Sequence, residues 1–140
     1  MSATFTLTDA LRDQVWREAR AAFPRECCGL IEGARTGGAV RATTLHPARN
    51  LAEAADRFEI DPAAQFRLLR ALRGTGREIV GCYHSHPDGR AEPSERDREN
   101  AGEEGFIWLL AALATRDDAA RLAAFSWQNA NFVPVALIQA

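Results

Sequence analysis

Residues 79–97 read IVGCYHSHPDGRAEPSERD, and this stretch decides the fold that we expect of the chain. It begins as an apolar strand and carries two histidines, His84 and His86, separated by one residue. In extended backbone such residues point to the same side, with Cα atoms roughly 6.5–7 Å apart. Two imidazoles placed this way can bind one cation, at about 2.0–2.1 Å each if the cation is zinc. Pro87 is expected to end the strand, so both histidines should sit at a sheet edge, where a site can open to solvent.

A third candidate ligand, Asp97, lies three residues after Ser94. On a helix that begins at Ser94 both side chains lie on about the same side. Two histidines and one carboxylate leave the fourth tetrahedral position to water, as in a catalytic zinc site. Zinc lowers the pKa of such a water towards about 7 and polarises a carbonyl oxygen, so that the zinc-bound water can attack. The Ser94 hydroxyl can donate to the developing oxyanion, whereas a general base must come from elsewhere in the chain.

Each of these residues also has an ordinary structural interpretation. Two histidines at the end of a strand can simply be exposed side chains. Ser94 followed by Asp97 is also typical of a helix N-cap with an acid in the first turn. Cys82 is expected to pack as a small apolar side chain, with a role beside the metal or as a fourth ligand as the alternative. His46, the remaining histidine, is expected to be a satisfied side chain in a loop or at a strand end.

The remaining sequence predicts a mixed sheet flanked by helices. Apolar residues recur at helical spacing after Thr8, and Asp61-Pro62 is typical of a helix start. We expect helices over 8–22, 61–73 and 94–102, loops over 47–55 and 85–93, and strands over 27–32, 39–46, 58–60, 77–84, 106–114, 122–127 and 132–138. This order, αβββαβαβββ, predicts an α/β or α+β sandwich.

Composition narrows the class of protein. The length of 140 residues indicates one domain, residues 1–140. The net charge of −2 and the lack of a basic stripe argue against nucleic-acid binding. No apolar stretch is long enough to cross a bilayer or to act as a signal peptide, so we expect a cytoplasmic protein with no membrane partner. All 17 basic residues are arginine, which excludes a lysine-based mechanism. The three cysteines, with Cys27 next to Cys28, do not predict a disulfide scaffold or a thiolate zinc site.

Other zinc enzymes fit the sequence less well. A nucleobase deaminase needs His-x-Glu and Pro-Cys-x-x-Cys, and neither is present. The His-Glu-x-x-His signature is absent as well. A metallo-β-lactamase site would need further histidines downstream, but no histidine follows His86.

The motif residues together closely resemble the JAMM motif of the JAB1/MPN/Mov34 zinc metalloproteases. In that motif His-x-His is followed, after seven residues, by Ser-x-x-Asp, as it is over 84–97. The motif also has a glutamate at the start of the first strand, and the segment PRECCGLIEG at 24–33 is similar, with Glu26 in that place. HPARN at 46–50 and RFEIDP at 57–62 are similar to the linking region of small bacterial members. One departure is Cys82, where many relatives have tryptophan.

The resemblance implies the JAB/MPN fold, which is similar to that of cytidine deaminase. It also implies one catalytic Zn²⁺, with Glu26 as general acid/base and Ser94 stabilising the tetrahedral intermediate. The ligands that it implies are His84, His86 and Asp97. Without the resemblance, Glu26 would be an ordinary solvated acid, no more distinctive than Glu32 or Glu92.

The resemblance also implies a substrate class. Active members of the family cleave peptide or isopeptide bonds after the Gly-Gly tail of ubiquitin or of ubiquitin-like proteins, and small bacterial members act on sulfur carriers. We therefore expect a zinc peptidase or isopeptidase whose substrate tail lies extended beside the sheet and can add to it as a strand. Asp88 and Arg90 are candidate tail contacts, or else a solvated turn. The alternatives are a non-catalytic MPN-type scaffold module and a zinc peptidase acting on cell-wall or phage-tail peptides. The sequence does not indicate an oligomeric state.

Overall fold

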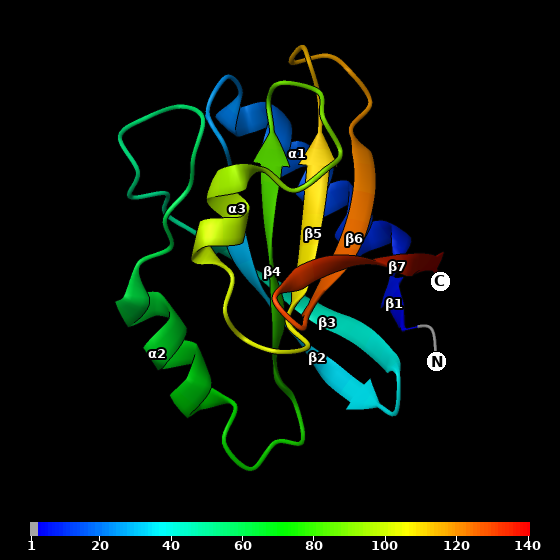
Figure 1. Cartoon of the computed structure of the whole chain (residues 1–140). Coiled ribbons are helices and arrows are strands. Elements are labelled where there is room, and N and C mark those ends of the chain that lie inside the picture. The colour runs from blue at the N-terminus through cyan, green and yellow to red at the C-terminus, as the bar shows by residue number, and fades with distance from the viewer. Residues whose placement is uncertain (1–2) are drawn as a thin grey trace.

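The computed structural model describes residues 3–140, which form a rolled sheet of seven strands with three helices against it (Figure 1). The elements in chain order are β1 (Thr4–Leu7), α1 (Asp9–Ala22), β2 (Cys28–Thr36), β3 (Ala39–Ala48), α2 (Pro62–Ala71), β4 (Glu78–His86), α3 (Glu95–Asn100), β5 (Ile107–Ala112), β6 (Arg121–Gln128) and β7 (Asn131–Gln139).

The strands are ordered β1-β3-β2-β4-β5-β6-β7, and pairing of β1 with β7 closes the sheet into a barrel. β4 pairs in parallel with β5 and antiparallel with β2, so the sheet is mixed, as the sequence predicts. The register sets Cys28 opposite His84 on one side and Leu110 opposite His84 on the other. The strand that carries both histidines therefore lies inside the sheet.

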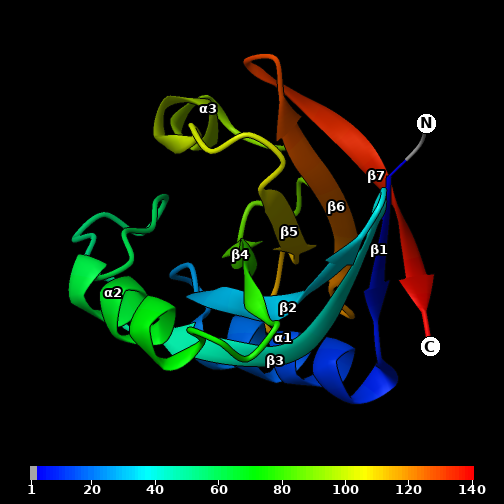
Figure 2. The same cartoon turned by 90° about the horizontal axis from the view of Figure 1, so that it is seen from below.

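The two larger helices pack on opposite faces of this sheet. In Figure 1, α1 runs behind β4 and β5, and α3 lies in front of β4. Ile31 belongs to the main core with Val15 of α1, whereas the neighbouring Leu30 packs with Leu68 of α2. Successive residues of a strand point to opposite faces, so β2 divides the two cores. The site described below lies on the face of α2 and α3, which Figure 2 shows on the same side of β4.

Gly29 leaves room for a side-chain contact between β4 and α1. A Cβ atom on Gly29 would lie 2.3 Å from the ring of Tyr83 on the adjacent strand, so only glycine leaves room for that ring. Tyr83 is fully buried, and its hydroxyl donates to Glu18 of α1 at 2.7 Å. This contact holds the strand that bears the histidines against the helix behind it.

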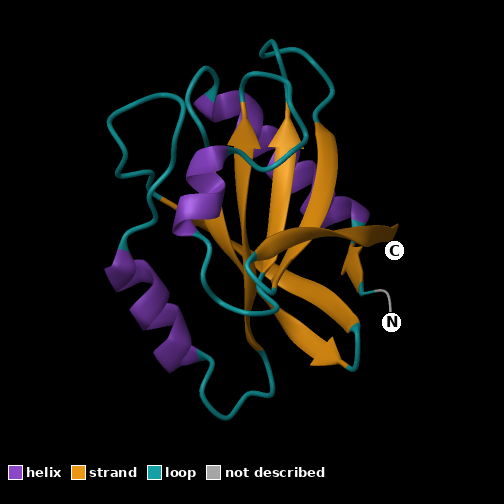
Figure 3. Ribbon diagram, viewed as in Figure 1, coloured by secondary structure: helices purple, strands orange, loops and turns teal. Residues whose placement is uncertain are grey.

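The strand predicted over 58–60 is wrong, and a strand that was not predicted starts the fold. Residues 58–60 contribute an isolated bridge between Asn50 and Ile60, within a long loop that joins β3 to α2 (Figure 3). The unpredicted strand is β1, which lies between β3 and β7 and carries Phe5 and Leu7, both fully buried. The alternation Thr-Phe-Thr-Leu was the available signal for this strand.

The helix starts agree with the prediction, and α1 ends at Ala22 as predicted, whereas α2 and α3 each end two residues earlier than predicted. Thr8 caps α1, Asp61 caps α2 with Pro62 in its first turn, and Ser94 caps α3. β4 runs on through His86 instead of ending at His84, because β5 supplies backbone partners up to that residue. Among residues 3–140, no helix has the length and apolar character that a membrane crossing requires.

Candidate metal centre

Three side chains from two elements converge at the carboxyl end of β4. The Nε2 atoms of His84 and His86 lie 2.9 Å apart. The Oδ2 atom of Asp97, from α3, lies 3.2 Å from Nε2 of His84 and 3.1 Å from Nε2 of His86. Within the part of the chain that the structure describes, these three form the group whose ligand atoms could share a metal ion.

The spacing of these atoms fits a metal ion. Four ligands at about 2.0–2.1 Å in a tetrahedron stand roughly 3.3 Å from one another. The three separations of 2.9, 3.1 and 3.2 Å are close to that edge. Two imidazoles and a carboxylate are also a donor set that suits zinc. The arrangement leaves one tetrahedral position for another ligand.

The two histidines are held in different ways. Nδ1 of His86 lies 2.9 Å from the backbone carbonyl of Arg90, and because a carbonyl only accepts, Nδ1 carries the hydrogen. Nε2 of His86 is then free to act as a ligand, the usual arrangement in metal sites. Nδ1 of His84 is buried and has no hydrogen-bond partner among the described residues. Its ring is instead stacked under Phe58, with centroids 4.2 Å apart and an interplanar angle of 23°.

Asp97 serves as a helix cap and a candidate ligand at once. Its backbone N–H donates to the Ser94 hydroxyl at 3.1 Å, and the Ser94 N–H donates to Asp97 Oδ2 at 2.9 Å. This capping box fixes the carboxylate against both histidines. The Ser94 hydroxyl accepts in this box, so its own hydrogen stays available for donation. The capping interpretation and the ligand interpretation of this pair are therefore compatible.

Burial and hydrogen bonding shift the pKa values of the three side chains in opposite directions. Burial alone would raise the pKa of Asp97, but contacts with both histidines hold it well below its usual range. Burial lowers the pKa of His84. Burial acts the same way on His86, but its pKa is raised overall because Asp97 stabilises the charged ring. The cluster therefore keeps a carboxylate anion beside at least one imidazole that burial favours as neutral, which is the state a metal needs.

Glu26 is brought to this site by the start of β2. Cys27 N–H donates to the Ser85 hydroxyl at 2.8 Å, and Ser85 N–H donates to the Cys27 carbonyl at 3.1 Å. These bonds extend the pairing of Cys28 with His84 by one step, so the next residue, Glu26, comes opposite His86. Burial, aided by Asp97 and opposed by His86, raises the pKa of Glu26 to about 7. Its carboxyl group can therefore gain or lose a proton near neutral pH.

The expectation of an open site at a sheet edge is wrong. The exposed fractions of His84, His86 and Asp97 are 0%, 5% and 3%. β2 and β5 flank the strand on both sides, and Phe58 covers the first histidine.

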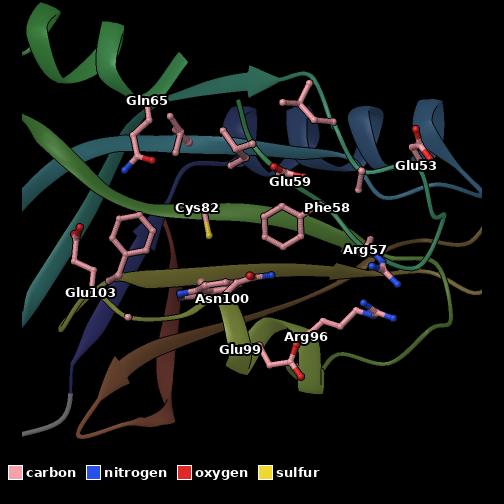
Figure 4. Close-up of a pocket in the computed structure, with 17 residues that line it drawn as sticks. Glu53, Arg57, Phe58, Glu59, Gln65, Cys82, Arg96, Glu99, Asn100 and Glu103 are labelled. Carbon is pink, nitrogen blue, oxygen red and sulfur yellow. The ribbon is translucent and has the colours of Figure 1, made fainter. Parts of the chain in front are cut away.

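A cavity of about 900 Å³ borders the cluster (Figure 4). Phe58 and Cys82 lie side by side in its wall, with Arg57 and Arg96 at one end and Gln65 at the other. A smaller hollow of about 410 Å³ is lined by Glu26, Arg25 and Asn50, among others. The candidate ligands line neither space, but His84 contacts Phe58 and Trp108, which line the larger one. Sequence reasoning missed Phe58, whose only signal was its place in the segment RFEIDP.

The other residues singled out from the sequence have ordinary roles. His46 is satisfied by Glu32, at 2.8 Å, as predicted. Cys82 is buried and lies outside the candidate ligand group; within residues 3–140 all three cysteines are free thiols. Asp88 accepts from the Arg90 N–H at 2.9 Å, which is a turn contact, while the Arg90 carbonyl orients His86.

The rolled mixed sheet and the His-His-Asp cluster at the end of its central strand define a JAB-type domain. The chain belongs to this family: the family model described as prokaryotic homologs of the JAB domain matches residues 8–129. A desampylase from Haloferax volcanii is 32% identical over 94% of this chain and 93% of its own length. A probable TtuB-protein conjugate cleaving protease from Thermus thermophilus is 35% identical over 68% of this chain and 59% of its own.

Solved structures agree with this assignment. Protein DSY2949 from Desulfitobacterium hafniense is 28% identical, with a TM-score of 0.86 over 98% of this chain and 93% of that one. AF2198, a JAB1/MPN domain protein from Archaeoglobus fulgidus, shares the fold at a TM-score of 0.56 and 17% identity, over 98% of this chain and 97% of that one. The predicted JAB/MPN fold is therefore confirmed.

Proposed function

We propose that this protein is a zinc-dependent peptidase or isopeptidase that cleaves after the Gly-Gly tail of a ubiquitin-like protein of the sulfur-carrier type. The observation that carries the proposal is the position of Glu26. A carboxyl group whose pKa is about 7 stands opposite His86, beside three side chains arranged as metal ligands. The names of the relatives from Haloferax volcanii and Thermus thermophilus support the substrate class.

The residues divide the chemistry among them. Zinc would be held by His84, His86 and Asp97, and when bound it supplies an activated water and polarises the scissile carbonyl. Glu26 takes a proton from the attacking water and returns it to the leaving nitrogen, so it works as base and then as acid. The Ser94 hydroxyl donates to the carbonyl oxygen as that oxygen gains negative charge.

The surroundings suit a narrow extended tail. The cavity has an apolar wall that includes Phe58 and Trp108 and a charged rim that includes Arg57 and Glu103. β4 is paired on both sides, so a tail beside it would lie across the cavity and could not extend that strand. Glycines at the cleaved end would pass the buried approach to His86 because they carry no side chain.

Intact-mass analysis of cleavage tests the proposal. Zinc-loaded protein is incubated with ubiquitin-like sulfur carriers that bear extensions or lysine-linked peptides after Gly-Gly. We expect a product ending at Gly-Gly from the wild type and from Glu92→Ala, an exposed glutamate that serves as a matched control. Glu26→Ala should form no product while still binding zinc.

Two results would contradict the proposal. Binding of zinc without cleavage of any such conjugate would redirect the site to other peptides, such as those of cell walls or phage tails. Failure to bind zinc at neutral pH would favour a scaffold module.

A further inference from the structure

The loop between β3 and α2 is pinned by one side chain. Asn50 uses its full hydrogen-bonding capacity there: Nδ2 donates to the carbonyls of Glu26, at 3.0 Å, and Arg57, at 3.1 Å. Its Oδ1 accepts from the N–H groups of Ala52, at 2.9 Å, and Glu59, at 3.0 Å. Asn50 thus closes the loop on itself and ties it to the backbone of Glu26.

Backbone contacts reinforce this closure. Leu51 N–H donates to the Glu59 carbonyl at 2.8 Å, next to the bridge between Asn50 and Ile60. The Arg25 guanidinium donates to the Ala52 carbonyl at 2.5 Å, a second link to the segment that carries Glu26. The position of Phe58 in this loop is therefore set by the same contacts that hold the backbone at Glu26.

Phe58 contacts His84, the candidate ligand whose Nδ1 has no hydrogen-bond partner among the described residues. His84 is fully buried, its Nδ1 has no partner among the described residues, and Phe58 stacks on its ring. Trp108 packs edge-on against both rings, at 6.0 Å from Phe58 and 5.7 Å from His84. A metal-binding histidine ordinarily donates its second ring N–H to a carbonyl, carboxylate or water. At His86 the Arg90 carbonyl accepts this bond, whereas Nδ1 of His84 has no such acceptor among the described residues and its ring is held by aromatic contacts.

We propose that the loop over residues 49–60 is a positioning element for the metal centre. Phe58 orients the imidazole of His84 by stacking, and Asn50 couples that orientation to the backbone of Glu26. The inference rests on the proposed metal site, and it assigns both residues a positioning role. It predicts that the metal affinity of the protein depends on an aromatic ring that bears no ligand atom.

The affinity for zinc measures the role of Phe58. Competition against a chromophoric chelator should show Phe58→Ala binding zinc about 10–100-fold more weakly, the cost typical of losing an outer-shell partner. Phe58→Tyr should restore affinity to within about threefold, because it keeps the stacked face. Phe66→Ala on α2 removes a phenylalanine that is 58% exposed and contacts Arg70 instead of a candidate ligand, so it should have no effect.

A double-mutant cycle measures the coupling through Asn50. Asn50→Ala should weaken zinc binding on its own, because Phe58 is released. Combined with Phe58→Ala, it should add little to the loss of zinc affinity caused by Phe58→Ala alone, since both changes remove the same stacking of Phe58 on His84. Fully additive losses, or zinc affinity unchanged in a folded Phe58→Ala variant, would overturn the proposal.

A second readout does not require metal. In the chelator-treated protein the His84 ring protons should resonate upfield, because they lie over the Phe58 ring. Phe58→Leu should move them downfield and broaden them, since leucine fills the space without a ring current. Unchanged His84 resonances would overturn the stacking role. If the wild type binds no zinc, the proposed function fails and this comparison alone decides the positioning role; if it binds zinc but cleaves nothing, only the proposed chemistry fails.

Discussion

Glu32 and Asp97 are both buried carboxylates that contact histidine, and they have opposite surroundings. In the Glu32 cluster, Glu32 accepts from His46 at 2.8 Å and from the guanidinium of Arg77. In the Asp97 cluster, Asp97 contacts His84 and His86. The exposed side-chain fractions of the two carboxylates are similar, at 8% and 5%.

The two carboxylates differ in the exposure and charge of the residues that contact them. His46 and Arg77 are 37% and 46% exposed, and the arginine charge balances the carboxylate. The histidines of the Asp97 cluster are 0% and 6% exposed, and their Nε2 atoms face each other. Glu32 has a fixed cation beside it, whereas the three side chains of the Asp97 cluster direct their ligand atoms toward one point, which is the arrangement of a metal site. Residue type alone does not separate these two cases.

Zinc affinity should show the largest difference between mutations in the two clusters. His86→Ala removes a candidate ligand, so zinc affinity should fall by more than the roughly 10–100-fold cost of losing an outer-shell partner. His46→Ala should bind zinc like the wild type, since its ring serves Glu32. Chelator competition measures both. Equal losses in the two variants would mean that the clusters are not functionally distinct.

Zinc should also stabilise the folded protein through the Asp97 cluster. At a free concentration of 100 times the dissociation constant, binding contributes about 2.7 kcal/mol, or roughly 10 °C in melting temperature for a domain of this size. Thermal unfolding with zinc and with chelator measures the shift. His46→Ala should retain it and His86→Ala should lose it. The same shift in His86→Ala would place the stabilising ion elsewhere.

Arg77→Ala should cost stability without affecting zinc. It leaves Glu32 buried with one partner, at a cost of about 2 kcal/mol because the arginine is half-exposed. Burial alone would raise the pKa of Glu32, but His46 and Arg77 lower it below 4.5 overall. This stabilisation is therefore present above pH 4.5 and is lost as pH falls through the folded-state value. The deficit in urea unfolding should therefore be largest at neutral pH and shrink in acid. A parallel loss of zinc affinity would contradict the separation of the clusters.

Glu26→Gln should show the opposite pH dependence. The pKa of Glu26 rises from 4.5 to about 7 on folding, so the metal-free wild type loses stability as pH rises between those values. The variant has no such proton, and it should gain about 3 kcal/mol of stability over the wild type between pH 4 and pH 8. Glu92→Gln, which is exposed, should show no such difference. A pH-independent difference for Glu26→Gln would show that its carboxyl group is not perturbed.

Local features were predictable from sequence, and contacts between distant segments were not. The caps at Asp61 and Ser94 follow from side chains that bind backbone groups two or three residues away. The prediction of a strand over residues 58–60 was wrong because the alternation of apolar and charged residues there does not come from pairing in a sheet. Phe58 stacks on His84, and Ile60 makes only an isolated bridge with Asn50. β1 was missed because four residues carry little signal until β3 and β7 pair with them.

The sequence by itself determined which residues could bind a metal, since His-x-His on a strand and an acid in the first turn of a helix are local patterns. The family resemblance added Glu26. Only the tertiary structure decided that Glu26 faces His86, that Phe58 supports His84, and that Glu32, not Glu26, is neutralised by an arginine. Burial, pKa and pairing depend on which distant segments meet. That is settled by the closure of the whole sheet, because the desolvation of a side chain is a property of everything packed around it.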